Sequence, residues 1–125
     1  MRKLLTYTLP RTFNKFNIPI AIQSNYLKDY AKNNNFEFSL PVTEIKTKNI
    51  YLELERITKK KIINIAMVSI FILPVKNLRL LNSLMTKVNA NTKFHFALEK
   101  LVLTKSQIKK WAYEYLKYKR VINFY

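Results

Sequence analysis

Short apolar runs alternate with segments of helical period along the chain. Residues 4–9 form an apolar run suited to a strand that Pro10 closes, and a polar loop follows over residues 11–17. Pro19 fits the first turn of a helix, where its missing N–H would have no partner anyway. Apolar residues then recur at helical spacing, so we predict a helix from Pro19 to about Asn33.

Asparagine and proline mark the boundaries of the next elements. Asparagine is the best left-handed residue in a chain without glycine, so asparagines 33–35 are expected to end this helix. Residues 36–40 form a second predicted strand, which Pro41 closes. Asn49 is a good N-cap, and the apolar stripe behind it predicts a helix that ends near lysines 59–61.

The second half of the chain repeats the alternation. Residues 62–73 carry almost no polar side chain, which is typical of a central parallel strand covered on both faces. We predict a helix over 78–88 and a fourth strand over 93–98. Thr104 and Gln107 resemble a capping box that opens the last helix. The apolar face of that helix is made of Ile108, Trp111, Ala112 and Tyr115.

Four strands alternating with four helices predict an α/β fold. We expect one domain over residues 1–125, a small three-layer unit with a mostly parallel four-stranded sheet and helices on both faces. By analogy with doubly wound sheets, the strands numbered in chain order are expected to lie in the order 2-1-3-4.

Composition removes several kinds of chemistry. The chain has 125 residues, no cysteine, no glycine and one histidine. These absences exclude disulfides, thiolate metal sites, thiol nucleophiles and glycine-rich phosphate loops, because such loops need a backbone without Cβ. The longest apolar stretch, residues 62–75, is too short to span a bilayer. We therefore expect a soluble, cytoplasmic protein without a transmembrane segment.

The net charge of +16 has two interpretations. Excess Lys and Arg is typical of proteins that bind nucleic acid or anionic membranes. A genome poor in G and C would also give a chain rich in Lys, Asn and Ile. Eighteen of the 23 basic residues are Lys, whereas a selected nucleic-acid surface would favour the bidentate Arg, so composition favours the coding-bias interpretation.

Candidate site residues follow from the predicted strand ends. In such sheets ligands bind outside the carboxyl ends of the strands. Carboxylates converging there near an arginine can hold sugar hydroxyls, or one can act as a general base if burial raises its pKa. The candidate catalytic residues are Glu44, His95 and Glu99, and the candidate ligand-binding residues are Arg11, Gln23, Thr43 and Ser69. No cofactor or metal site is predicted.

Each candidate also has a purely structural interpretation. For Glu44 and Glu99 the structural interpretation, as solvated loop residues or simple partners of nearby lysines, is favoured over a catalytic one. His95 fits a core histidine with satisfied hydrogen bonds, and Ser69 fits a buried hydroxyl bonded to backbone. On the last helix, aromatic residues alternate with lysines, which suits base stacking or a membrane interface. The alternative is that Trp111 and Tyr115 pack on the sheet.

Several blocks of residues resemble one family. They are Ile18-Pro19 with Gln23, residues 26–31, Thr43-Glu44 with Asn49 and Tyr51, Ser69-Ile70-Phe71 with Leu73-Pro74, and residues 95–99. Together, over roughly residues 7–99, they look like the sporadic carbohydrate cluster family, small bacterial proteins found in gene clusters for surface-polysaccharide sugars. The family has no established activity, so the resemblance implies a pathway context. Its members often have glycine in the first strand and loop, and this chain has none.

A more distant likeness is to the N-terminal catalytic domain of serine recombinases. That domain has a similar strand-helix order, an early Tyr-x-Arg-x-Ser stretch and a following helix with a glutamine. Here Tyr7 and Arg11 lie too far apart and no serine follows, so the nearest hydroxyls are those of Thr8 and Thr12. The likeness therefore implies a shared fold and argues against recombinase chemistry.

Three functional hypotheses follow. The first is a protein of surface-carbohydrate biosynthesis that binds or processes a sugar or sugar-nucleotide at the strand carboxyl ends, with Arg11 holding a carboxylate or phosphate. The second is a basic nucleic-acid-binding module. The third is a non-catalytic partner of a carbohydrate enzyme from the same gene cluster, and a homo-oligomer is compatible with each.

Overall fold

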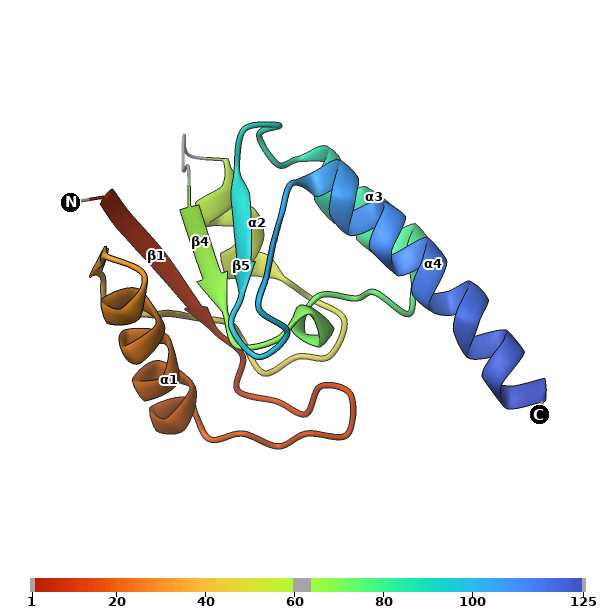
Figure 1. Cartoon of the computed structure of the whole chain (residues 1–125), viewed down its shortest axis with the longest axis horizontal. Coiled ribbons are helices and arrows are strands. Elements are labelled where there is room, and N and C mark those ends of the chain that lie inside the picture. The colour runs from red at the N-terminus through yellow and green to blue at the C-terminus, as the bar shows by residue number, and fades with distance from the viewer. Residues whose placement is uncertain (1, 60–63, 125) are drawn as a thin grey trace.

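The computed structural model describes residues 2–59 and 64–124. Its strands are β1 (Arg2–Thr8), β2 (Phe36–Phe38), β3 (Val42–Thr43), β4 (Asn64–Met67), β5 (Lys93–Phe96) and β6 (Leu101–Leu103). Its helices are α1 (Ile20–Asn33), α2 (Leu52–Thr58), the short 3-10 helix η1 (Ile70–Ile72), α3 (Leu78–Thr86) and α4 (Lys105–Phe124) (Figure 1).

The sheet has the order β2-β1-β4-β5-β6, with β3 paired to the end of β1. Strands β2, β1, β4 and β5 are parallel to one another. They correspond to the predicted second, first, third and fourth strands, and they lie in the predicted order 2-1-3-4. The sequence pattern did not predict β3 or β6. The latter pairs antiparallel with β5, where residues 97–100 form a turn in place of the end of the predicted strand 93–98.

Helices cover both faces of this α/β sheet, as predicted. Along one face α1 packs against β1, β2 and β4, whereas α2 lies behind β4 and β5 in Figure 1. All four residues of β4 are buried, because this central strand has neighbours on both faces and both edges. At the β6 side of the sheet, α3 and α4 pack side by side (Figure 1). A single hydrophobic cluster joins all these layers.

The predicted third strand, residues 62–73, is confirmed over Asn64–Met67 and wrong over its second half, residues 68–73. Residues 62 and 63 lie outside the described residues, and β4 ends at Met67. The chain then bends at Ser69 into η1, although Ile70 and Ile72 remain fully buried. A continuous apolar run does not distinguish a strand from a buried helical turn. Ser69 is therefore the N-cap of η1 and not a strand residue.

Among the described residues, five that are not glycine adopt the left-handed backbone conformation. They are Asn14, Lys15, Asn35, Asn49 and Lys100. Asn35 follows α1 with φ 59°, which confirms that the asparagine run ends that helix. Asn49, in contrast, does not cap α2, because the helix begins at Leu52 and Asn49 lies in the loop before it with φ 63°. The N–H of Thr104 donates to Gln107 Oε1 at 2.9 Å, the backbone half of the predicted capping box.

Candidate functional site

A groove of about 600 Å³ lies at the carboxyl edge of the sheet. It is formed by residues 9–15 after β1, residues 46–51 before α2, and residues 71–77 between η1 and α3. Its cationic side chains are Arg11, Lys15, Lys46, Lys48 and Lys76. None of the described residues that line it is acidic. The groove therefore combines the position expected of a ligand site with a strongly positive lining.

Arg11 forms hydrogen bonds to the loop that makes one wall of the groove. Its Nη1 donates to the carbonyl oxygens of Ile45 at 3.3 Å and Ile50 at 3.1 Å, and also to that of Thr47. The guanidinium carbon lies 4.8 Å from the ring centroid of Tyr51. Nη2 is buried without a hydrogen-bond partner among the described residues. Arg11 thus lines the groove as predicted, with much of its hydrogen bonding directed at the 45–50 loop.

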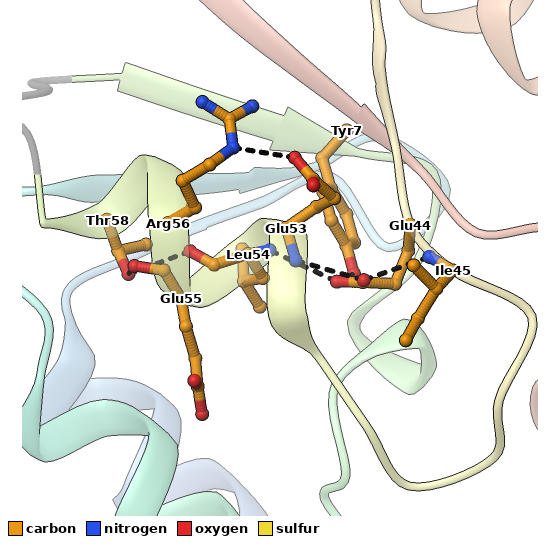
Figure 2. A network of polar contacts seen from close by, with 8 residues as sticks. All are labelled: Tyr7, Glu44, Ile45, Glu53, Leu54, Glu55, Arg56 and Thr58. Carbon is orange, nitrogen blue, oxygen red and sulfur yellow. Dashed lines mark hydrogen bonds and ion pairs between the residues drawn. The ribbon is translucent and has the colours of Figure 1, made fainter.

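Glu44 caps α2 from a distance along the chain (Figure 2). Its Oε1 accepts the N–H groups of Ile45 and Glu53 at 2.9 and 3.0 Å. Its Oε2 accepts the Tyr7 hydroxyl at 2.7 Å and the Leu54 N–H at 3.1 Å. Burial alone would raise the pKa of Glu44, but these hydrogen bonds outweigh it and lower the pKa. The carboxylate is therefore ionised and fully engaged, which does not suit a general base.

Tyr7 shares this buried network. Burial raises the pKa of its hydroxyl, and the hydrogen bond to the Glu44 carboxylate raises it further. A phenol that donates to a carboxylate and has a raised pKa is held in its neutral form. Tyr7 therefore acts as a hydrogen-bond donor within the core and presents no nucleophile to the groove.

Ser69 and Glu99 are two predicted site residues whose side chains are joined by a hydrogen bond. The Ser69 hydroxyl donates to Glu99 Oε2 at 2.8 Å, and the Ile70 N–H donates to Oε1 at 2.6 Å. Ser69 Oγ in turn accepts the Phe71 N–H at 3.2 Å. These bonds cap η1 and tie the chain after β4 to the turn after β5. The arrangement explains why the chain bends at Ser69.

His95 lies away from the carboxyl edge. Its Nδ1 is 2.8 Å from the Tyr30 hydroxyl near the end of α1, and its Nε2 is 2.9 Å from Asn64 Oδ1 at the start of β4. The ring of Phe36, the first residue of β2, contacts it edge-on. Burial lowers the pKa of His95 to about 4, and the charges of nearby basic residues add to this. The ring of His95 thus contacts residues at the amino ends of β4 and β2, and its hydrogen bonds go to Tyr30 and Asn64 and not to Glu99.

Gln23 and Thr43 also bond within the protein. The Gln23 side chain accepts the Leu9 N–H at 3.1 Å and donates to the carbonyl oxygens of Leu9 and Ile18, both at 2.8 Å. It therefore joins the end of β1 to the start of α1. The hydroxyl of Thr43 lies 3.0 Å from that of Thr8 on the paired strand. Of the seven predicted site residues, only Arg11 lines the groove.

Sequence reasoning missed the four groove lysines, although a signal was present. Lys15, Lys46 and Lys48 lie in the loops that follow the first two predicted strands, and Lys76 lies just after Pro74. The same strand-end rule that selected Arg11 applies to them. Lysines are so common in this chain that the position of any one of them does not by itself indicate a site.

A partly exposed aromatic cluster adjoins the groove. Phe71, which lines the groove, contacts the rings of Trp111 and Tyr115 on α4 at centroid distances of 5.8 and 5.4 Å. The rings of Trp111 and Tyr115 stack with centroids 5.3 Å apart and 5° between their planes. Trp111 and Tyr115 thus pack on η1, a partner that the sequence pattern did not predict. We call Phe71, Trp111 and Tyr115 the aromatic ledge.

The part of the chain that the structure describes holds neither a metal-binding cluster nor a membrane-spanning helix. No group of three or more His, Asp or Glu side chains there could hold a metal ion. No helix in that part is long and apolar enough to cross a membrane.

Comparison with known proteins identifies a fold and not a family. No family model matches the chain, and no curated protein matches it either. Among solved structures, it is similar to the N-terminal catalytic domain of TP901-1 integrase, with a TM-score of 0.65 and 18% sequence identity. That similarity covers 98% of this chain and 99% of the other. The fold expected from the recombinase likeness is confirmed, whereas no comparison supports the carbohydrate-cluster resemblance.

Proposed function

We propose that the protein binds the phosphate backbone of nucleic acid in the groove at the carboxyl edge of the sheet. The observation that carries this proposal is the lining, in which Arg11, Lys15, Lys46, Lys48 and Lys76 come together on three loops without an acidic residue among them. Phosphate contacts supply most of the affinity in such complexes. A groove lined by charges of one sign raises the local concentration of the opposite ion.

The groove lysines have no carboxylate partner among the described residues. Among the described residues, ion pairs join Arg56 to Glu53 and Lys87 to Glu55, and neither pair includes a cation of the groove. Lys76 Nζ donates to Asn14 Oδ1 at 2.8 Å, which satisfies a hydrogen bond without neutralising the charge. Partial burial lowers the pKa of Lys76, and repulsion from Lys119 and Lys15 lowers it further. An anion in the groove would relieve this repulsion.

The hydrogen bonds of Arg11 hold the 45–50 loop of the groove in place before a ligand binds. Lys46 and Lys48 are exposed and flank Thr47, whose carbonyl oxygen Arg11 holds. Fixing the loop in advance removes part of the entropy cost that flexible lysines otherwise bring to binding. Arg11 therefore contributes charge to the groove and also positions two of its lysines.

The similarity to an integrase catalytic domain agrees with a nucleic-acid ligand. The proposal is limited to binding. The Tyr-x-Arg-x-Ser stretch of the serine recombinases lacks its serine here, and the nearby hydroxyl of Thr8 is bonded to Thr43. No strand cleavage or exchange is included.

Fluorescence anisotropy with labelled duplex and single-stranded oligonucleotides, at salt concentrations from about 50 to 200 mM, tests the proposal. The double variant K46Q/K48Q removes two groove charges. Its matched control is K28Q/K32Q, which removes two exposed lysines from the far half of α1. We expect the groove variant to lower the log–log salt slope by about 0.7–0.9 for each lysine lost, and the control to leave it nearly unchanged. Absence of binding at about 50 mM salt, or equal effects of the two variants, would contradict the proposal.

An anionic sugar or sugar-nucleotide is a second candidate ligand. A groove of about 600 Å³ is within the size range of small-molecule sites, and it lies where the fold places ligands. Arg11 would hold the phosphate or carboxylate. Thermal-shift measurements with nucleotide sugars and acidic sugars test this candidate, which predicts stabilisation that is lost in Arg11→Ala. If no ligand stabilises the wild-type protein, the candidate is rejected.

A further inference from the structure

The aromatic ledge is continuous with the basic groove. Phe71 belongs to both, because it lines the groove and touches Trp111 and Tyr115. Lys76 Nζ lies 6.0 Å from the Phe71 ring centroid, on the groove side of the ledge. Lys119 lies one turn beyond Tyr115 on α4 and interacts electrostatically with Lys76. Two mutually repelling cations therefore lie beside the ledge.

The ledge leaves aromatic surface accessible. Phe71, Trp111 and Tyr115 are each half-buried. Their rings contact one another, and Phe71 and Trp111 also pack against the hydrophobic core. Phe71 meets the other two rings in T-shaped arrangements, at 75° and 71°, so it is not part of their stack. Tyr118 follows at helical spacing and is 63% exposed.

We infer that the ligand is single-stranded nucleic acid, whose phosphates lie on the groove lysines while its unpaired bases stack on the aromatic ledge. The inference rests on the proposed function and specifies its substrate class. Aromatic side chains beside a positively charged groove are the combination that binds single strands without a sequence requirement. In a duplex the base faces are covered by neighbouring base pairs, so the ledge would contribute nothing to binding a duplex.

The charges on α4 agree with an anionic ligand. Over residues 105–119 the helix carries Lys105, Lys109, Lys110, Lys117 and Lys119 against a single acid, Glu114. A base stacked on Trp111 or Tyr115 would keep its own phosphate within reach of these lysines. Buried apolar residues of α4, Ile108 and Ala112, are turned to the core, which leaves the ledge on the flank of the helix.

The test uses Trp111, which is the only tryptophan in the chain and therefore the sole source of its indole emission. Wild-type protein is titrated with the single strands oligo(dT) and oligo(U), and with the duplex oligo(dA)·oligo(dT). We expect both single strands, or one of them, to quench Trp111 emission and to bind more tightly than the duplex. If only one quenches, it identifies DNA or RNA as the ligand. Equal affinity for the duplex, or binding without any change in Trp111 emission, would overturn the inference.

Paired variants locate the stacking. Tyr115→Leu should weaken single-strand binding about tenfold and leave duplex binding within about twofold. Tyr113→Leu is the matched control, because Tyr113 is 64% exposed on α4 but lies away from the ledge. Tyr115→Phe should retain wild-type affinity. If Tyr115→Leu does not fold, the wild-type quenching titration decides alone.

Failure of this inference can be distinguished from failure of the proposed function. Tight, salt-dependent binding of duplex without quenching keeps the groove as a phosphate site and rejects the ledge. If neither the duplex nor the single strands bind at about 50 mM salt, both proposals fail.

Discussion

Replacing Glu44 by Gln tests whether this buried carboxylate is a structural cap. The substitution keeps the size of the side chain but leaves one acceptor oxygen where the wild type has two. That oxygen can keep two of the four donors, which are the Tyr7 hydroxyl and the N–H groups of Ile45, Glu53 and Leu54. The new amide NH₂ then faces at least one buried backbone N–H across a hydrogen-bond distance, with no acceptor between them.

The expected destabilisation is about 3 kcal/mol. A buried donor left without a partner costs about 1–3 kcal/mol, and the remaining bonds lose their charge assistance. The negative charge at the start of α2 is also lost, which costs a further few tenths of a kcal/mol. For 125 residues, unfolding entropy of about 2.1 cal/mol/K per residue converts this loss to about 10 °C in Tm.

Urea unfolding measured from pH 7 down to pH 3 is the assay. The lowered pKa means that Glu44 stabilises the fold fully above its unfolded value of about 4.3, and that this contribution is lost as pH falls through the folded value. The difference between wild type and Glu44→Gln should therefore shrink on acidification. Glu37→Gln, at an exposed position on β2, is the control and should cost under about 0.5 kcal/mol. A Glu44→Gln protein as stable as this control would refute the reasoning.

Two further predictions concern the core and the turns. His95 gives the only histidine signals in an NMR titration; burial should hold it neutral until pH falls to about 4, and stability should decline between about pH 6.5 and 4 as the unfolded chain takes up the proton. A midpoint near 6.5, or an unchanged decline in His95→Gln, would contradict this. Lys100 has φ 56° in the turn between β5 and β6, so Lys100→Gly should raise Tm by about 2–4 °C, whereas Asn35→Gly should change it less because asparagine tolerates this conformation. A lower Tm for Lys100→Gly would show that the turn is unstrained.

The order of elements was predictable because it depends on local signals. Proline and asparagine stand at the element boundaries of a chain without glycine, and the apolar period changes between them. The bend at Ser69 was not predictable in this way. It depends on two hydrogen bonds from Ser69 and Ile70 to Glu99, 30 and 29 residues further along the chain. The same holds for α2, whose start is fixed by Glu44 and not by the nearby Asn49.

The sequence led to the edge of the sheet where the groove lies, but not to most of the residues that line it. The strand-end rule led to Arg11 and to the edge of the sheet where the groove lies. The same rule selected Glu44 and Glu99, because the chain has only seven acids and an acid at a strand end therefore stands out. Both selected acids are used in capping: Glu44 holds α2 and Glu99 holds η1. An acidic side chain can accept hydrogen bonds from backbone N–H groups at the start of a helix, or it can bind a substrate. Sequence spacing does not distinguish these two roles.

The capping roles of these acids bear on the origin of the positive charge. Coding bias accounts for many lysines over the whole surface, and with 23 basic residues against seven acids most of them lack an acidic partner. At the carboxyl edge the fold adds a specific reason for this. Glu44 and Glu99 lie near the carboxyl edge, yet their oxygens accept hydrogen bonds from Tyr7, Ser69 and backbone N–H groups. They are therefore not available to pair with the groove lysines. Whatever produced the lysines, no described carboxylate compensates their charge in this groove, and the proposed anionic ligand rests on that feature.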